Sequence, residues 1–109
     1  MEYQIYVNDQ ESKAIKLATK GPELISEFNN SKLASKYDIM LMPEFGSWMI
    51  EAVPKKPYDS LVDAGELLSC EEKLHYRRFA LKKFCKEYGV QLASLANVPT
   101  LGTPNHILL

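Results

Sequence analysis

The first half of the chain consists of short apolar runs separated by turn residues, a pattern typical of β-strands. Residues 1–7 alternate loosely and place Tyr3, Ile5 and Val7 on one face. A helix is expected at residues 21–28, because glycine and proline begin it and two asparagines follow it. The remaining pattern predicts further strands at residues 14–19, 38–42 and 48–53, with residues 45–47 forming a hairpin turn between the last two.

The second half is predicted to be mainly helical. Two serines precede an acidic residue by three positions, the spacing of a helix N-terminal capping motif: Ser60 with Asp63, and Ser69 with Glu72. The second motif introduces the longer helix, and Gly89 stands where the C-terminal cap of that helix is expected. The apolar stripe of this helix consists of Leu74, Leu81, Phe84, Cys85 and Tyr88. The pattern then predicts a strand at residues 90–95 and a loop marked by Pro99, Gly102 and Pro104.

The order of these elements predicts the fold class. Strands first, one long helix and then another strand make an α+β arrangement, in which a mostly antiparallel sheet packs on the helix. With 109 residues the chain forms one domain at most. The sequence finishes on the three bare aliphatic residues 107–109, so we expect that it is cut there.

The composition and charge of the chain exclude several classes of protein and of partner. Apolar residues make up 46% and charged residues 25% of the chain, which indicates a globular protein. The net charge of −1 gives no electrostatic reason to expect nucleic acid or an anionic membrane as a partner, and no apolar run approaches the ~20 residues of a membrane span. No signal peptide is visible, and Cys70 and Cys85 would lie about 22 Å apart on one helix, too far for a disulfide. A cytoplasmic location is therefore expected.

Two carboxylates, Glu44 and Glu51, flank the predicted hairpin turn. Glu51 shares a strand face with Met49 and Val53. If that face is buried, the charge needs a partner, and a hard cation such as Mg²⁺ prefers oxygen ligands. Glu2, at the start of the first strand, joins them if the two strands are neighbours. The alternative is that a glutamate at alternating spacing faces water, and the spacing alone favours this alternative.

The segment at residues 43–58 carries the pattern Pro-Glu-aromatic-Gly-x-aromatic-Met-aliphatic-Glu-small-x-Pro-x-x-Pro-Tyr. This pattern resembles the N-terminal segment of the eukaryotic-type glutamate–cysteine ligase (gamma-glutamylcysteine synthetase) catalytic subunit. In that family both glutamates of the pattern bind active-site magnesium ions, so the resemblance assigns this role to Glu44 and Glu51. The family also has an acidic-x-Glu-Tyr strand whose glutamate binds metal. Glu2 and Tyr3 match the second half of that strand, and the position of its first acidic residue precedes this sequence.

Weaker similarities extend along the rest of the chain. Arg77 and Arg78 resemble a basic cluster in the corresponding helix of the family, which implies contact with substrate or phosphate. A solvated helix face is the alternative for both arginines. Residues 99–104 resemble a Pro-Arg-aliphatic-Gly-Cys-Pro loop of the family, although Thr100 replaces its arginine and Thr103 replaces its cysteine.

The resemblance implies that residues 1–109 form a partial glutamate–cysteine ligase catalytic domain, a piece of a glutamine-synthetase-like fold. The family uses ATP to convert the γ-carboxylate of glutamate into an acyl phosphate that the amine of cysteine attacks, in the first step of glutathione biosynthesis. Metal ions neutralise charge between carboxylates and phosphates, so Glu2, Glu44 and Glu51 are expected to be Mg²⁺ ligands and not acid–base catalysts. The implied partners are L-glutamate, L-cysteine and ATP, with a regulatory subunit as a further candidate.

Two functions from different classes therefore remain open. The family's catalytic subunit is several times longer than this chain. Its substrate-binding residues, most of its nucleotide contacts and its remaining metal ligands have no counterpart here. The first function is an ATP-dependent ligase to which this chain supplies part of the metal site, with the isolated chain inactive. The second is a shortened, non-catalytic module that binds a cation or a partner.

Overall fold

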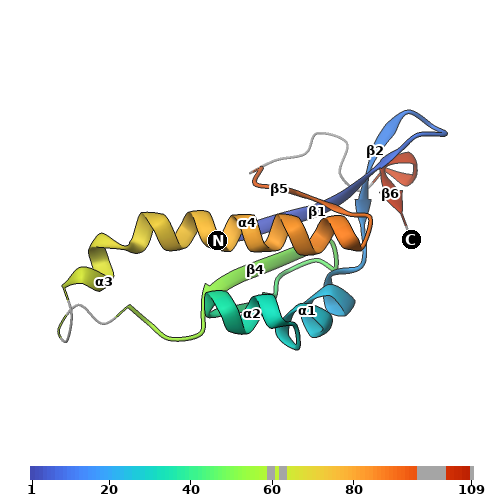
Figure 1. The fold of residues 1–109 in the computed structure, drawn as a ribbon. Helices are drawn as coiled ribbons and strands as arrows, with labels where there is room; N and C mark the ends of the chain where they lie inside the picture. The colour runs from blue at the N-terminus through green and yellow to red at the C-terminus, as the bar shows by residue number, and fades with distance from the viewer. Residues whose placement is uncertain (59–60, 62–63, 96–102, 109) are drawn as a thin grey trace.

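The computed structural model describes residues 1–58, 61, 64–95 and 103–108, which form an α+β fold. The elements in chain order are β1 (Glu2–Asp9), β2 (Ala14–Ala18), α1 (Gly21–Asn29), α2 (Lys32–Tyr37), β3 (Ile39–Pro43), β4 (Met49–Pro54), α3 (Gly65–Leu68), α4 (Cys70–Glu87), β5 (Gln91–Ala93), the 3₁₀ turn η1 (Pro104–His106) and β6 (Ile107–Leu108). The long helix α4 runs across the sheet, and α1 and α2 lie alongside it (Figure 1).

β1 is the central strand of the sheet, and each neighbouring strand pairs with a different part of it. β4 pairs with residues 2–4 of β1, β5 with residues 4–6 and β2 with residues 6–9, all in the antiparallel sense. The strand order is β3-β4-β1-β2-β6, and only the described pair of β2 and β6 is parallel. The mostly antiparallel sheet expected from the sequence is confirmed, and so is the hairpin of β3 and β4.

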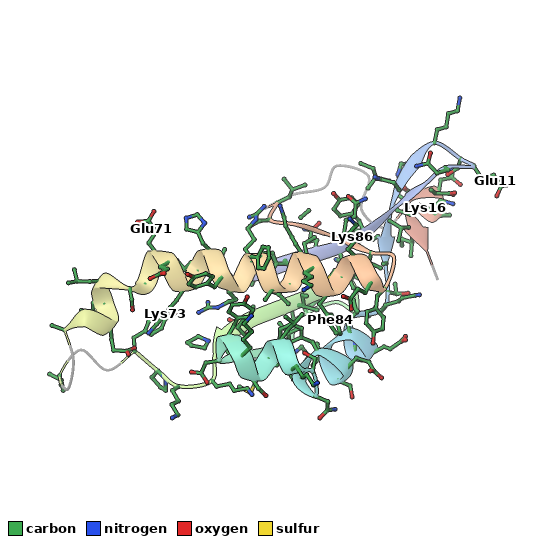
Figure 2. All side chains as sticks on the ribbon, viewed as in Figure 1. Glu11, Lys16, Glu71, Lys73, Phe84 and Lys86 are labelled. Atoms are coloured by element: carbon green, nitrogen blue, oxygen red, sulfur yellow. The ribbon has the colours of Figure 1, made fainter. Side chains whose placement is uncertain are left out.

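One face of the sheet forms the hydrophobic core. Alternation turns Tyr3 and Ile5 of β1 and Ile50 of β4 toward the helices, where each is at most 1% exposed. Phe84 of α4 lies between that helix and the shorter helices (Figure 2), and its ring meets the ring of Phe28 edge to face, with 5.1 Å between centroids. Each fully buried large apolar side chain stabilises the fold by ~1.5–3 kcal/mol. This face therefore determines how the helices pack on the sheet.

The predicted long helix α4 is confirmed. Its predicted C-terminal cap is correct, whereas its predicted N-terminal capping hydrogen bond is wrong. Gly89 adopts a φ of 69°, and the N–H groups of Gly89 and Val90 donate to carbonyls of the last helical turn, which is a Schellman motif. Ser69, by contrast, makes no capping hydrogen bond to α4. Its hydroxyl donates to the carbonyl of Glu66 at 3.0 Å, because α3 leads directly into α4 and supplies an acceptor there.

The apolar pattern does not predict α2. Ser31 caps this helix by accepting a hydrogen bond from the N–H of Ala34 at 3.3 Å. Asp38 ends the helix in the left-handed conformation, with a φ of 54°, so β3 begins at Ile39 and not at Asp38. Six residues are too few to display helical periodicity, and the capping serine is the sequence signal that points to this helix.

Two predicted features lie outside the described residues, namely the capping pair Ser60 and Asp63 and most of the loop at residues 99–104. Cys70 and Cys85 both lie on α4 as free thiols, as their spacing predicts. Among the helices that the structure describes, none combines the length and the apolar character needed to cross a membrane.

Candidate functional site

Glu2 and Glu51 lie directly opposite each other on the neighbouring strands β1 and β4. Their neighbours Tyr3 and Ile50 face the core, so both carboxylates belong to the opposite face of the sheet. Directly opposite residues of an antiparallel pair have Cβ atoms ~4.5–5.5 Å apart. The strand of Glu2 is therefore a neighbour of the strand of Glu51, as the predicted role of Glu2 requires.

Glu44 lies in the loop after β3, outside the strand pairing that unites Glu2 and Glu51. Its Oε2 accepts a hydrogen bond from the N–H of Phe45 at 3.2 Å. Among the described residues, no three His, Cys, Asp or Glu side chains come together closely enough to hold a metal ion. The structure thus brings together two of the three predicted ligands, and the metal role of all three stays a prediction.

The loop that carries Glu44 is held by backbone hydrogen bonds from two elements. The N–H of Gly21, at the start of α1, donates to the carbonyl of Ser47 at 2.7 Å, and the N–H of Ile5 in β1 donates to the carbonyl of Trp48 at 2.8 Å. A Cβ atom on Gly21 would stand 2.5 Å from the carbonyl oxygen of Ser47, so this close approach requires glycine. Helix α1 and strand β1 together fix where the loop leaves the sheet.

The carboxylates of Glu2 and Glu51 have no cationic partner among the described residues. The hydrogen bonds and ion pairs of the described part of the chain engage neither side chain. Two like charges directly opposite each other on paired strands destabilise a sheet. A divalent cation between them removes this repulsion, and carboxylates are ligands that Mg²⁺ and Ca²⁺ prefer. The pair therefore fits a hard cation.

A hollow of about 320 Å³ lies beside Glu2. Its lining residues are Glu2, Tyr3, Gln4, Met49, Ser94 and Leu95. Gln4 is 8% exposed, and its Nε2 donates to the carbonyl of Leu95 at 3.1 Å, whereas its Oε1 has no hydrogen-bond partner. The sequence-based prediction misses Gln4. The signal that points to it is its position two residues after Glu2, which places both side chains on the same strand face.

Arg77 is buried, with 5% exposed, on the side of the sheet that α4 covers. Its Nη2 donates to the hydroxyl of Tyr58 at 2.8 Å and its Nη1 to the carbonyl of Ala52 at 3.4 Å. The interpretation of Arg77 as part of a solvated helix face is wrong, because its guanidinium is buried and donates to Ala52 of β4 and to Tyr58. Arg78 is half-buried. Contact of either arginine with substrate or phosphate stays a prediction.

Charges of opposite sign lie on the two sides of β1. On the core side, burial raises the pKa of the Tyr3 hydroxyl, and the positive charges of Arg78 and Arg77 oppose this rise. On the other side lie the carboxylates of Glu2 and Glu51. The buried Arg77 and the two glutamates therefore lie on opposite sides of β1.

Comparison with known proteins agrees with the family that the pattern at residues 43–58 resembles. The family model for glutamate–cysteine ligase matches residues 1–108. The glutamate–cysteine ligase of Candida albicans is 27% identical over 109 residues, which cover 94% of this chain and 15% of that protein. The human glutamate–cysteine ligase catalytic subunit is 26% identical and the rat one 24% identical, each over 110 residues that cover 99% of this chain and 17% of the relative.

The chain thus spans only 15–17% of the length of these curated relatives. No solved structure matches it, and the expected glutamine-synthetase-like fold stays a prediction. Because the family model covers nearly every residue, from 1 to 108, the chain belongs to the glutamate–cysteine ligase family.

Proposed function

We propose that this chain forms part of the active site of an ATP-dependent glutamate–cysteine ligase, with Glu2, Glu44 and Glu51 as ligands of Mg²⁺. The complete enzyme joins the γ-carboxylate of L-glutamate to the amine of L-cysteine, the first step of glutathione biosynthesis. The observation that carries the proposal is the pairing of Glu2 with Glu51 on the face of the sheet opposite the core. Membership of the family supplies the reaction.

The reaction explains why such a site needs carboxylates. A carboxylate is a poor acyl donor, because its leaving group would be oxide, so the γ-carboxylate must first receive a phosphoryl group from ATP. When bound, the cations neutralise charge on the phosphate oxygens and favour in-line transfer. Glutamate side chains on a hydrogen-bonded sheet hold such ions in fixed positions.

The residues of this chain contribute positioning and charge to the proposed site. Glu2 and Glu51 present two carboxylates from adjacent strands, and the register of β1 with β4 fixes their separation. Glu44 would join them from the loop that Gly21 holds through the carbonyl of Ser47. None of these glutamates is assigned a proton transfer, because a carboxylate bound to a cation stays deprotonated.

The proposal extends to location and partners. Free thiols at Cys70 and Cys85 suit a reducing compartment, and we place the enzyme in the cytoplasm on this ground. L-glutamate, L-cysteine and ATP are the proposed substrates, and a regulatory subunit remains a candidate partner.

A non-catalytic module is the second candidate function. One observation favours it, which is that the described residues bring together only Glu2 and Glu51, two of the three proposed ligands. Such a module could fold, bind a cation through Glu2 and Glu51, and catalyse nothing. Metal binding alone therefore does not separate the two functions, and activity must be measured as well.

Unfolding of the purified 109-residue chain with and without Mg²⁺ tests the metal role. Without the cation, Glu51→Gln should be as stable as the native chain or more stable by ~0.2–1 kcal/mol, because it removes a repulsion between like charges. Millimolar Mg²⁺ should stabilise the native chain and should have a much smaller effect on Glu51→Gln. Glu11→Gln removes the same charge from an exposed turn and serves as the matched control. Equal stabilisation of the native chain and Glu51→Gln by Mg²⁺ would contradict the metal role.

Activity separates the ligase from the non-catalytic module. In the complete protein that contains this chain, Glu51→Gln should reduce glutamate- and cysteine-dependent ADP release by at least ~10-fold while folding stays nearly intact. Glu11→Gln should leave the rate unchanged. A loss of folding that matches the loss of activity would instead identify Glu51 as a structural residue.

A further inference from the structure

Gln4 carries a buried polar atom without a partner on the sheet face that holds Glu2 and Glu51. The carbonyl of Leu95 accepts a hydrogen bond from Nε2, so the orientation of the side-chain amide is determined. This orientation leaves Oε1 as the free acceptor, and Oε1 is buried and unpaired. An unpaired buried acceptor costs ~1–3 kcal/mol, and native proteins usually provide a partner such as a water molecule or an ion.

The surroundings of Gln4 select a positively charged partner. Glu2 lies two residues earlier on the same strand face, and Glu51 lies directly opposite Glu2. The residues that line the hollow include the carboxylate of Glu2 and no lysine, arginine or histidine. An anionic ligand would be repelled by both glutamates, whereas a cation is attracted to both.

We propose that Gln4 supplies its Oε1 as a further oxygen ligand to the divalent cation that Glu2 and Glu51 bind. This inference rests on the proposed function, because it takes the metal role of the two carboxylates as given. Amide oxygens of glutamine side chains are established ligands of hard cations such as Ca²⁺. A Mg²⁺–oxygen distance of ~2.0–2.1 Å is shorter than a ~2.8 Å hydrogen bond to water, so an ion that has lost part of its hydration shell can approach Oε1 more closely than a water molecule can.

The amide of Gln4 then connects the cation to the chain that follows β5. Its Oε1 binds the ion while its Nε2 holds the carbonyl of Leu95, so occupancy of the metal site and docking of this segment stabilise each other. A methionine at this position would preserve the size of the side chain and abolish both contacts.

Mn²⁺ binding to the purified 109-residue chain, followed by the electron paramagnetic resonance signal of the free ion, tests the proposal. Gln4→Met should weaken Mn²⁺ binding by about 10-fold, because one protein ligand is lost. Gln4→Glu keeps an oxygen at this position and should bind at least as tightly as the native chain. Gln91→Met makes the same substitution on the neighbouring strand β5 and should leave the affinity unchanged.

The outcomes separate this inference from the metal role of the carboxylates. Native-like affinity in Gln4→Met, together with weakened binding in Glu2→Gln, would overturn the role of Gln4 and leave the carboxylates as ligands. No binding by the native chain, or native-like binding in Glu2→Gln, would overturn both. Reduced thermal stability of Gln4→Met with unchanged Mn²⁺ affinity would also overturn the role of Gln4, because Oε1 would then bind an ordered water of purely structural importance.

Discussion

Glu2 and Glu51 form a candidate cation site only because strand pairing places them side by side. A single glutamate on the outer face of an antiparallel sheet is an ordinary water-facing residue. The register of β1 with β4 places the two side chains opposite each other, and a shift by one residue would turn either of them into the core. The resulting repulsion of ~0.2–1 kcal/mol is small beside the stabilisation by the core. The fold can therefore tolerate the pair without a cation, and the two carboxylates stay available for the proposed metal role.

Cys85 provides a prediction at the scale of one residue. It is 1% exposed on α4, and burial raises the pKa of its thiol to about 12. Because the thiolate is the reactive form, Cys85 in the native chain should resist modification by a disulfide reagent at pH ~8, whereas the half-buried Cys70 should react. Both thiols should react in guanidinium chloride. Rapid reaction of Cys85 in the native chain would show that α4 does not pack as described.

The raised pKa of Cys85 also sets the direction of a pH effect on stability. The folded chain holds the thiol proton more tightly than the unfolded chain, whose thiol titrates near the ordinary value of 9.0. This contribution to stability is fully present below that value and is lost as the pH rises from about 9 toward 12. In urea unfolding at increasing alkaline pH, the free energy of unfolding should decline less steeply in Cys85→Ala than in the native chain.

At the scale of elements, Arg77 joins α4 to the end of β4 and to the segment that follows it. Arg77→Met should lower the free energy of unfolding by ~2 kcal/mol, because the hydroxyl of Tyr58 and the carbonyl of Ala52 lose a charged donor. Arg78→Met is the matched control on the same helix. Arg78 is only half-buried and forms no hydrogen bond among the described residues, so its replacement should change the stability by less than ~0.5 kcal/mol.

The same pair of variants tests the predicted contact with phosphate. If Arg77 served only to bind a phosphate, Arg77→Met would unfold at the same urea concentration as the native chain and would bind nucleotide more weakly in the complete protein. The contacts with Tyr58 and Ala52 predict instead that Arg77→Met unfolds at a lower urea concentration than the native chain.

Elements with a clear local pattern could be predicted from the sequence. The alternation of residues 1–7 identified the core face of β1, and the helical stripe with Gly89 at its end identified α4. Elements that are very short, or whose ends are set by tertiary contacts, could not be predicted from the sequence. α2 is too short to show periodicity, and β5 covers residues 91–93 of the predicted 90–95, because Val90 belongs to the cap of α4.

The candidate site follows the same division. A specific pattern predicts Glu44 and Glu51 as ligands, and a shorter one predicts Glu2. Gln4 and the burial of Arg77 depend on strand pairing and helix packing between distant segments. A local pattern indicates which face of an element a side chain occupies, but what covers that face is decided by tertiary contacts.

At the scale of the whole molecule, the chain is extended for its length. Its dimensions are 51 × 27 × 20 Å, and its radius of gyration of 15.3 Å exceeds the ~13 Å typical of a compact domain of this size. Several large apolar side chains are exposed, among them Phe45 at 95%, Leu68 at 88% and Phe79 at 57%. Exposed apolar residues mark a surface that packs on another part of a protein or on a partner where they form a contiguous patch, whereas single ones are ordinary on a protein surface.

The last prediction concerns the protein in which these residues function. An antibody against the 109 residues should detect, in an extract of the source cells, a band several times larger than 12.4 kDa. The reason is that the proposed reaction requires binding groups for ATP, glutamate and cysteine around one cation site, whereas the chain corresponds to 15–17% of its curated relatives. The purified chain alone should release no ADP when glutamate and cysteine are added. A band near 12.4 kDa would favour the non-catalytic module, and ADP release by the isolated chain that depends on both amino acids would contradict the need for further residues.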